Sequence, residues 1–149
     1  MASIPDTCDA DWPSSKIACN AFVIAVAADV GVTLTGIADQ IVGQIQGADW
    51  TQLGHDGAAA AAAAADGKLV IGGLKAADTV PSPGKPQPTE GHVVVVIDGT
   101  LDHDLYPKAW WGSTDPDVRE KGQGKLSINY AWNTASRDKV IYASHNQGS

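Results

Sequence analysis

The sequence predicts an α+β fold in which N-terminal helices pack on an antiparallel sheet. Apolar residues recur at helical spacing through the first third of the chain. From residue 68 onward they form short runs of β-branched residues bounded by glycine and proline. Helices followed by a series of strands are typical of this class. A chain of 149 residues is long enough for one core, so we expect a single domain over residues 1–149.

Residues 1–13 are expected to form an irregular start before the first helix, because Pro5 and Pro13 act as helix breakers. Ser14 or Ser15 is placed to cap this helix, and Gly31 is placed to end it. The helix is apolar on nearly all sides, which is typical of a central, buried helix.

Two further helices are expected before the sheet. Residues 36–46 predict an amphipathic helix whose apolar stripe is formed by Ile37, Ile41, Val42 and Ile45. Residues 58–65 are eight alanines between two Asp-Gly pairs. Because alanine is the best helix former, they predict a short helix packed closely on a flat surface. Trp50 and Leu53 predict a short packed connection between these two helices.

The second half of the chain predicts the strands. Three are expected, at residues 68–74, 91–98 and 108–113, and a closing hairpin is expected from residues 127–132 and 139–144. Between the first two strands lies the proline-rich segment Pro81–Pro88. Its prolines cannot donate ladder hydrogen bonds, so we expect a semi-rigid, extended loop near the head of the next strand.

Composition excludes several functions. A net charge of -7 argues against a nucleic-acid ligand, since proteins that bind nucleic acids usually carry basic patches. The longest apolar run, residues 17–32, is too short to span a bilayer and contains Asn20 and Asp29. The N-terminus lacks the features of a secretory signal, so we expect synthesis in the cytoplasm and no membrane insertion. Two cysteines are too few for a disulfide framework or a cysteine zinc site, and no metal or cofactor is expected.

Cys19 and His92 are the candidate catalytic residues. Cys19 opens the first apolar helix, where the positive end of the helix dipole favours a thiolate. His92 opens a strand of four valines, which would hold its imidazole in a fixed orientation. An imidazole beside a thiolate can form an ion pair with it and move its proton. This order of helix cysteine and strand histidine is typical of papain-like cysteine hydrolases.

Simpler interpretations stay open at this point. Free cysteines are usually buried and behave as small hydrophobic residues, and a strand-end histidine is more often structural. A Cys8–Cys19 disulfide is an alternative, and it would occupy the proposed nucleophile. The alternative functions are a papain-like protease or deamidase that acts on a cytoplasmic protein, and a non-catalytic binding module.

The residues around both positions resemble the first family of type VI secretion amidase effectors. The resemblance covers most of the chain from Cys19 and is carried by residues 19–23, 27–32, 69–75, 91–97 and 106–113. It implies a papain-like, NlpC-related peptidoglycan amidase that cleaves the D-glutamyl–meso-diaminopimelate bond of stem peptides. It also implies a nucleophile at Cys19, a base at His92, delivery by the type VI secretion machinery into the periplasm of a rival bacterium, and a cognate immunity protein.

Two departures from the family accompany the resemblance. The segment Val80–Glu90 is longer than usual, and Trp111 stands where family members can have cysteine. An indole N–H only donates, so it cannot accept a proton from His92, and a backbone carbonyl of Trp110 or Trp111 is expected to orient the ring. One oxyanion donor is expected from the Cys19 backbone. Trp110 is the candidate residue for the substrate groove. The helix dipole and the ion pair with His92 are expected to lower the pKa of Cys19 from about 8.5 to well below neutrality.

Overall fold

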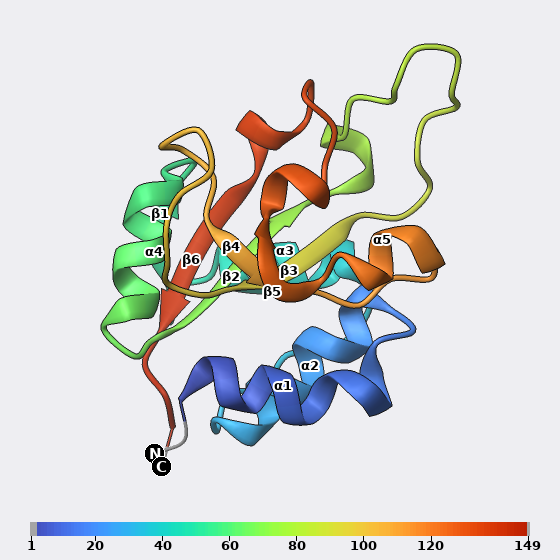
Figure 1. Ribbon diagram of the computed structural model, residues 1–149. Coiled ribbons are helices and arrows are strands. Elements are labelled where there is room, and N and C mark those ends of the chain that lie inside the picture. The colour runs from blue at the N-terminus through green and yellow to red at the C-terminus, as the bar shows by residue number, and fades with distance from the viewer. Residues whose placement is uncertain (1–2, 149) are drawn as a thin grey trace.

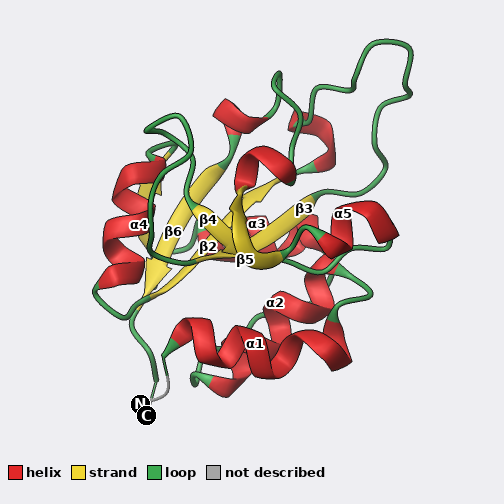
Figure 2. Ribbon diagram, in the orientation of Figure 1, coloured by secondary structure: helices red, strands yellow, loops and turns green. Residues whose placement is uncertain are grey.

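The computed structural model describes residues 3–148 and is built on one six-stranded sheet. Its strand order is β1-β6-β2-β3-β4-β5, and every neighbouring pair is antiparallel. The strands are β1 (Thr51–Gly54), β2 (Leu69–Leu74), β3 (His92–Val96), β4 (Lys108–Trp110), β5 (Gln123–Ser127) and β6 (Ile141–His145). Helices pack on this antiparallel sheet, which confirms the predicted α+β, papain-like class (Figure 2).

Five α-helices accompany the sheet within the described part of the chain. They are α1 (Ile4–Ser15), α2 (Cys19–Asp29), α3 (Ala38–Ile45), α4 (Gly57–Ala65) and α5 (Pro116–Glu120). In Figure 1, α1 and α2 lie side by side below the sheet, and α4 lies beside β6. The predicted alanine helix and the helix over residues 36–46 are both confirmed, the latter slightly shorter. No helix in residues 3–148 has the length and apolar content that a membrane crossing requires.

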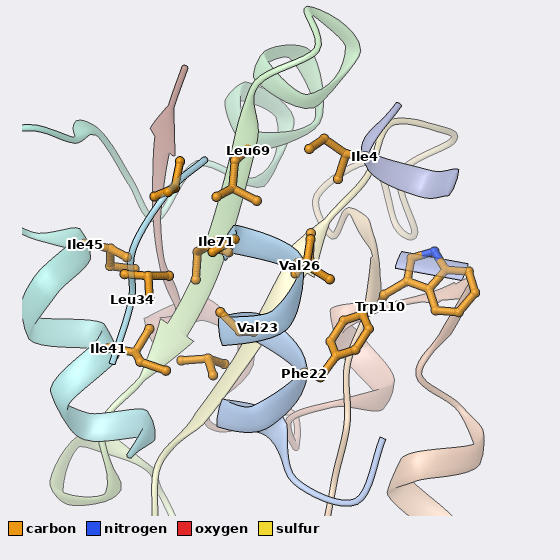
Figure 3. Close-up of a cluster of buried hydrophobic side chains, with 14 of the residues drawn as sticks. Ile4, Phe22, Val23, Val26, Leu34, Ile41, Ile45, Leu69, Ile71 and Trp110 are labelled. Atoms are coloured by element: carbon orange, nitrogen blue, oxygen red, sulfur yellow. The ribbon is translucent and has the colours of Figure 1, made fainter. Parts of the chain in front are cut away.

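The two central strands of the sheet, β2 and β3, are buried on both faces. One set of their side chains packs with α1, α2 and α3 and includes Leu69, Ile71, Val93 and Val95 (Figure 3). The alternate set packs against α4 and the later part of the chain and includes Val70, Leu74, Val94 and Val96. Because successive strand residues point to opposite faces, an unbroken apolar run in each strand serves both cores.

The expected irregular start is wrong, because residues 4–15 form α1. Ser3 caps this helix by accepting the backbone N–H of Asp6, and Pro5 lies in the first turn, where no intrahelical donor is needed. The expected cap of the next helix at Ser14 or Ser15 is also wrong. Those serines end α1, and the N-cap of α2 is Ala18, which has no capping side chain.

The predicted closing hairpin is also wrong. β5 begins at Gln123 and pairs with β4, whereas β6 lies between β1 and β2. Residues 128–130 form a 3₁₀ turn that Ser127 caps by accepting the N–H of Asn129. β6 pairs with the buried strand β2 because its apolar residues need two covered faces. β1 forms where a packed connection was expected and completes the sheet edge.

The proline-rich segment Pro81–Pro88 contains no helix or strand, as its prolines predict. Its base is held by hydrogen bonds to the chain that follows β5. The Asn133 side chain donates to the Val80 carbonyl at 2.8 Å, and the Val80 N–H donates to the Ser136 hydroxyl at 2.9 Å. The Gln87 amide donates to two carbonyls just before the loop. In Figure 1 the rest of the loop projects away from the sheet.

The apolar stripe of α3 is confirmed at three of its four positions. Ile41, Val42 and Ile45 are buried, whereas Ile37 at the N-cap is 59% exposed. The exception has a local cause, because the Ile37 backbone is still extended before the helix begins. Its side chain therefore leaves the buried face of the helix.

These two isoleucines supply a matched test of the core. Ile41→Ala should lower the free energy of unfolding by about 2–5 kcal/mol, because the side chain is fully buried. Ile37→Ala should change it by less than about 0.5 kcal/mol. Urea denaturation followed by circular dichroism measures both values. Equal losses in the two variants would contradict the placement of α3.

Candidate active site

Cys19 is the first residue of α2, and its sulfur lies beside the head of β3. The Sγ atom is 4.0 Å from the carbonyl oxygen of Gly91, the residue before His92. Ala18, the N-cap, provides no side-chain acceptor for the first backbone N–H groups of the helix. A helix start whose N–H groups lack a cap is a ready site for negative charge. The sequence therefore folds so that these donors surround the thiol.

His92 begins β3 and pairs with Leu74 of β2. Two indoles pack against its ring in edge-to-face geometry. The Trp132 centroid is 5.1 Å away at an interplanar angle of 70°, and the Trp111 centroid is 6.4 Å away at 77°. Nε2 of His92 is buried and has no hydrogen-bond partner among the described residues. The ring is thus positioned by packing, and Nδ1 is the nitrogen left to face the solvent side.

Two neighbouring cavities meet at Cys19. The first has a volume of about 160 Å³ and includes His92 and Ser113 in its walls. The second, of about 200 Å³, has Ile37 and Ala38 instead. Both are lined by Ala18, Cys19, Asn20, Glu90, Gly91 and Thr114. The structure thus brings the predicted pair, Cys19 and His92, to the wall of one cavity.

Burial governs the ionisation of both groups. It raises the pKa of the Cys19 thiol, although backbone N–H groups of Val93, Asn20 and Cys19 itself favour the thiolate and oppose the rise. The same loss of solvent lowers the pKa of His92 to about 4. The expected pKa of Cys19 well below neutrality is therefore wrong for the free site. Burial thus favours a neutral thiol and a neutral imidazole in the free site.

The structure corrects the two tryptophan assignments. Trp110 is buried and packs on Trp12, with centroids 6.5 Å apart, so it does not line the cavities at Cys19. Trp111 is fully buried, and its carbonyl accepts a hydrogen bond from the Trp12 indole at 3.0 Å. Its own indole donates to the Val118 carbonyl. Neither tryptophan forms a hydrogen bond with His92, and Trp111 contacts the ring only by packing.

The second cysteine lies away from the site. Cys8 is fully buried in α1, where burial and the nearby Asp11 and Asp9 raise the pKa of its thiol. Both cysteines are free, so the alternative of a Cys8–Cys19 disulfide is not what the structure shows. No group of three or more histidine, cysteine or acidic side chains within residues 3–148 is arranged to hold a metal ion.

Sequence reasoning missed four polar residues of the site, Asn20, Glu90, Ser113 and Thr114. Ser113 and Thr114 follow β4 and reach α2 because Gly112 packs against the backbone there. A Cβ atom at Gly112 would lie 2.6 Å from the Ala18 carbonyl oxygen. The Ser113 N–H donates to the Lys16 carbonyl at 2.8 Å. Gly112 was the available signal, since a glycine after a strand often marks a close backbone approach.

Comparison with known proteins identifies the family of the chain. No family model matches the chain. The chain is 37% identical to the peptidoglycan amidase Tse1 of Pseudomonas aeruginosa over 147 residues, which cover 93% of this chain and 86% of that protein. It belongs to the first family of type VI secretion amidase effectors. Membership of this amidase effector family confirms the resemblance stated from the sequence.

The burial of His92 predicts a pH dependence of stability. An unfolded histidine takes up a proton below about pH 6.5, whereas folded His92 does so only near pH 4. The unfolded state therefore binds more protons between these values, and stability falls as the pH drops through this window, by about 3 kcal/mol for this group.

Urea denaturation of the wild type and of His92→Gln at pH 7 and pH 4.5 measures this contribution. Between pH 7 and pH 4.5 the wild type should lose more stability than the variant, because the remaining titratable groups are the same in both proteins. Identical losses in the two proteins would show that His92 titrates normally in the folded state.

Proposed function

We propose that the chain is a peptidoglycan amidase, a cysteine hydrolase that cleaves the D-glutamyl–meso-diaminopimelate bond of stem peptides. One observation supports this most strongly. Cys19 at an uncapped helix start and His92 at a strand start face one cavity, in a chain of the effector family. The name of the relative, a peptidoglycan amidase, supports the substrate class. We propose that residues 1–149 act as one amidase domain.

In the proposed reaction, the Cys19 sulfur attacks the carbonyl carbon of the scissile amide. His92 takes the thiol proton through Nδ1, because Nε2 is enclosed by protein. The oxyanion is stabilised by backbone N–H groups at the start of α2, including that of Cys19. Protonated His92 then donates its proton to the departing amine, which leaves an acyl-enzyme. His92 next activates the water that releases the carboxylate product.

The neutral pair sets the timing of the proton transfer. Burial opposes charge on both partners, so a preformed thiolate–imidazolium pair is disfavoured in the free site. We infer that His92 acts as a general base while the sulfur attacks. The charge that develops then spreads over the substrate oxygen and the imidazole, where the N–H groups of α2 stabilise it. Trp111 and Trp132 position the ring for this step by packing against it.

We further propose that the protein is made in the cytoplasm, delivered by the type VI secretion machinery and active in the periplasm of the target bacterium. A cognate immunity protein would protect the producer. Membership of the effector family supports both inferences. The entrance of the cavities at Cys19 is the surface that such an inhibitor would need to cover.

Cys19→Ala tests the proposed nucleophile, and Cys8→Ala is its matched control. With purified sacculi, Cys19→Ala should lower the release of muropeptides by about a thousandfold or more, because the covalent step is lost. Cys8→Ala should keep wild-type turnover once circular dichroism shows that it is folded. Mass spectrometry identifies the cleaved bond. Undiminished release by Cys19→Ala would end the nucleophile assignment, and cleavage of folded proteins instead of sacculi would favour a protease.

The pKa of His92 predicts the pH profile. A general base must be neutral in the free enzyme, and this imidazole stays neutral down to about pH 4. The acidic limb of kcat/KM should therefore lie well below pH 6.5, the position of an unperturbed histidine. Turnover of a soluble stem peptide from pH 3.5 to pH 8 measures it. A midpoint at or above pH 6.5 would contradict general-base action by a buried His92.

A further inference from the structure

Glu90 is the only Asp, Glu, Lys or Arg among the described residues that line the two cavities at Cys19. It lies in both walls, immediately before Gly91, whose carbonyl oxygen is 4.0 Å from the sulfur. The residue is exposed, and no lysine or arginine in residues 3–148 forms an ion pair with it. The carboxylate is therefore free to bind a ligand that enters the site.

The position of Glu90 is unfavourable for a cysteine enzyme without substrate. Its negative charge acts together with burial to raise the pKa of Cys19, which opposes formation of the thiolate. A neutral side chain at position 90 would leave the nucleophile easier to ionise. The Glu90 carboxylate thus opposes ionisation of the Cys19 thiol until a positive charge next to it offsets its own.

The shape of the second cavity indicates which positive charge fits. Its walls include the exposed Ile37 and the small Ala38, and they do not include His92. An aliphatic chain can lie along these apolar side chains while an ammonium group at its end reaches Glu90, as the stems and heads of long charged side chains do. The cavity volume of about 200 Å³ is sufficient for such a chain.

We propose that Glu90 binds an ammonium group on the substrate residue next to the scissile amide, and that this pairing activates Cys19 by cancelling the negative field of the carboxylate. The inference rests on the proposed function, in which meso-diaminopimelate supplies a second amino group. Substrate recognition and activation of the nucleophile are then one event. No electron or group transfer is added to the reaction, since the thiol proton still passes to His92.

Glu90→Gln tests this proposal with two readouts that should move in opposite directions. In the free enzyme, alkylation of Cys19 by iodoacetamide at pH 7 should become at least about twofold faster, because a larger fraction of the thiol is ionised. For a stem peptide with a free side-chain amine, the kcat/KM of the variant should be at least about tenfold lower than that of the wild type. The same peptide acetylated on that amine should be cleaved equally by both proteins. Glu120→Gln, in the exposed α5, is the matched control and should change none of these values.

Three results would overturn the proposal. They are unchanged alkylation of Cys19 in Glu90→Gln, equal loss of kcat/KM for the free and the acetylated peptide, or no discrimination between the two peptides by the wild type. Binding keeps this test separate from the proposed function. In a Cys19→Ala background, calorimetry should show that Glu90→Gln weakens binding of the free-amine peptide and not of the acetylated one, even where the wild type cleaves neither.

Discussion

The packing of α2 against β3 is the contact on which the rest of the site depends. α2 has almost no polar side, and its residues Phe22, Val23 and Val26 are fully enclosed between the sheet and α1. A helix buried to this extent cannot rotate or slide without opening the core. The sulfur at its first residue is consequently held beside the strand that carries His92. The geometry of the candidate site is here a by-product of core formation.

The same burial sets the electrostatic character of the site. Helix N–H groups favour a negative sulfur, whereas exclusion of water opposes it, and the second effect is larger in the free protein. The imidazole responds to the same environment by losing its proton. Two neutral partners cost less to bury than an ion pair, which is why the proposed mechanism transfers the proton only as the sulfur attacks an incoming carbonyl. Burial therefore favours an uncharged site in the absence of substrate.

The sequence was informative wherever one local pattern decided the structure. The buried strands β2 and β3, the alanine helix and the pair Cys19 and His92 follow from runs of similar residues and from familiar helix and strand starts. The errors share another cause, since each depended on contacts between distant segments. α1 forms although it contains two prolines: Pro5 lies in the first turn, where its missing N–H is not needed, and the helix continues through Pro13. β6 pairs with β2 instead of with β5, the strand before it in the chain. Trp110 packs on Trp12 of α1. The polar residues after β4 reach the site only through the close approach at Gly112.

The hydrogen bonds at the base of the proline-rich loop, which we call the latch, bear on how freely the length of this loop can change. Hydrogen bonds of Asn133, Ser136 and Gln87 hold the base of the loop before the chain reaches β3, and none of these bonds involves the tip of the loop. Residues can be gained or lost beyond the latch without moving the imidazole. For the experimenter, the tip is the natural place to insert an epitope or a fluorophore.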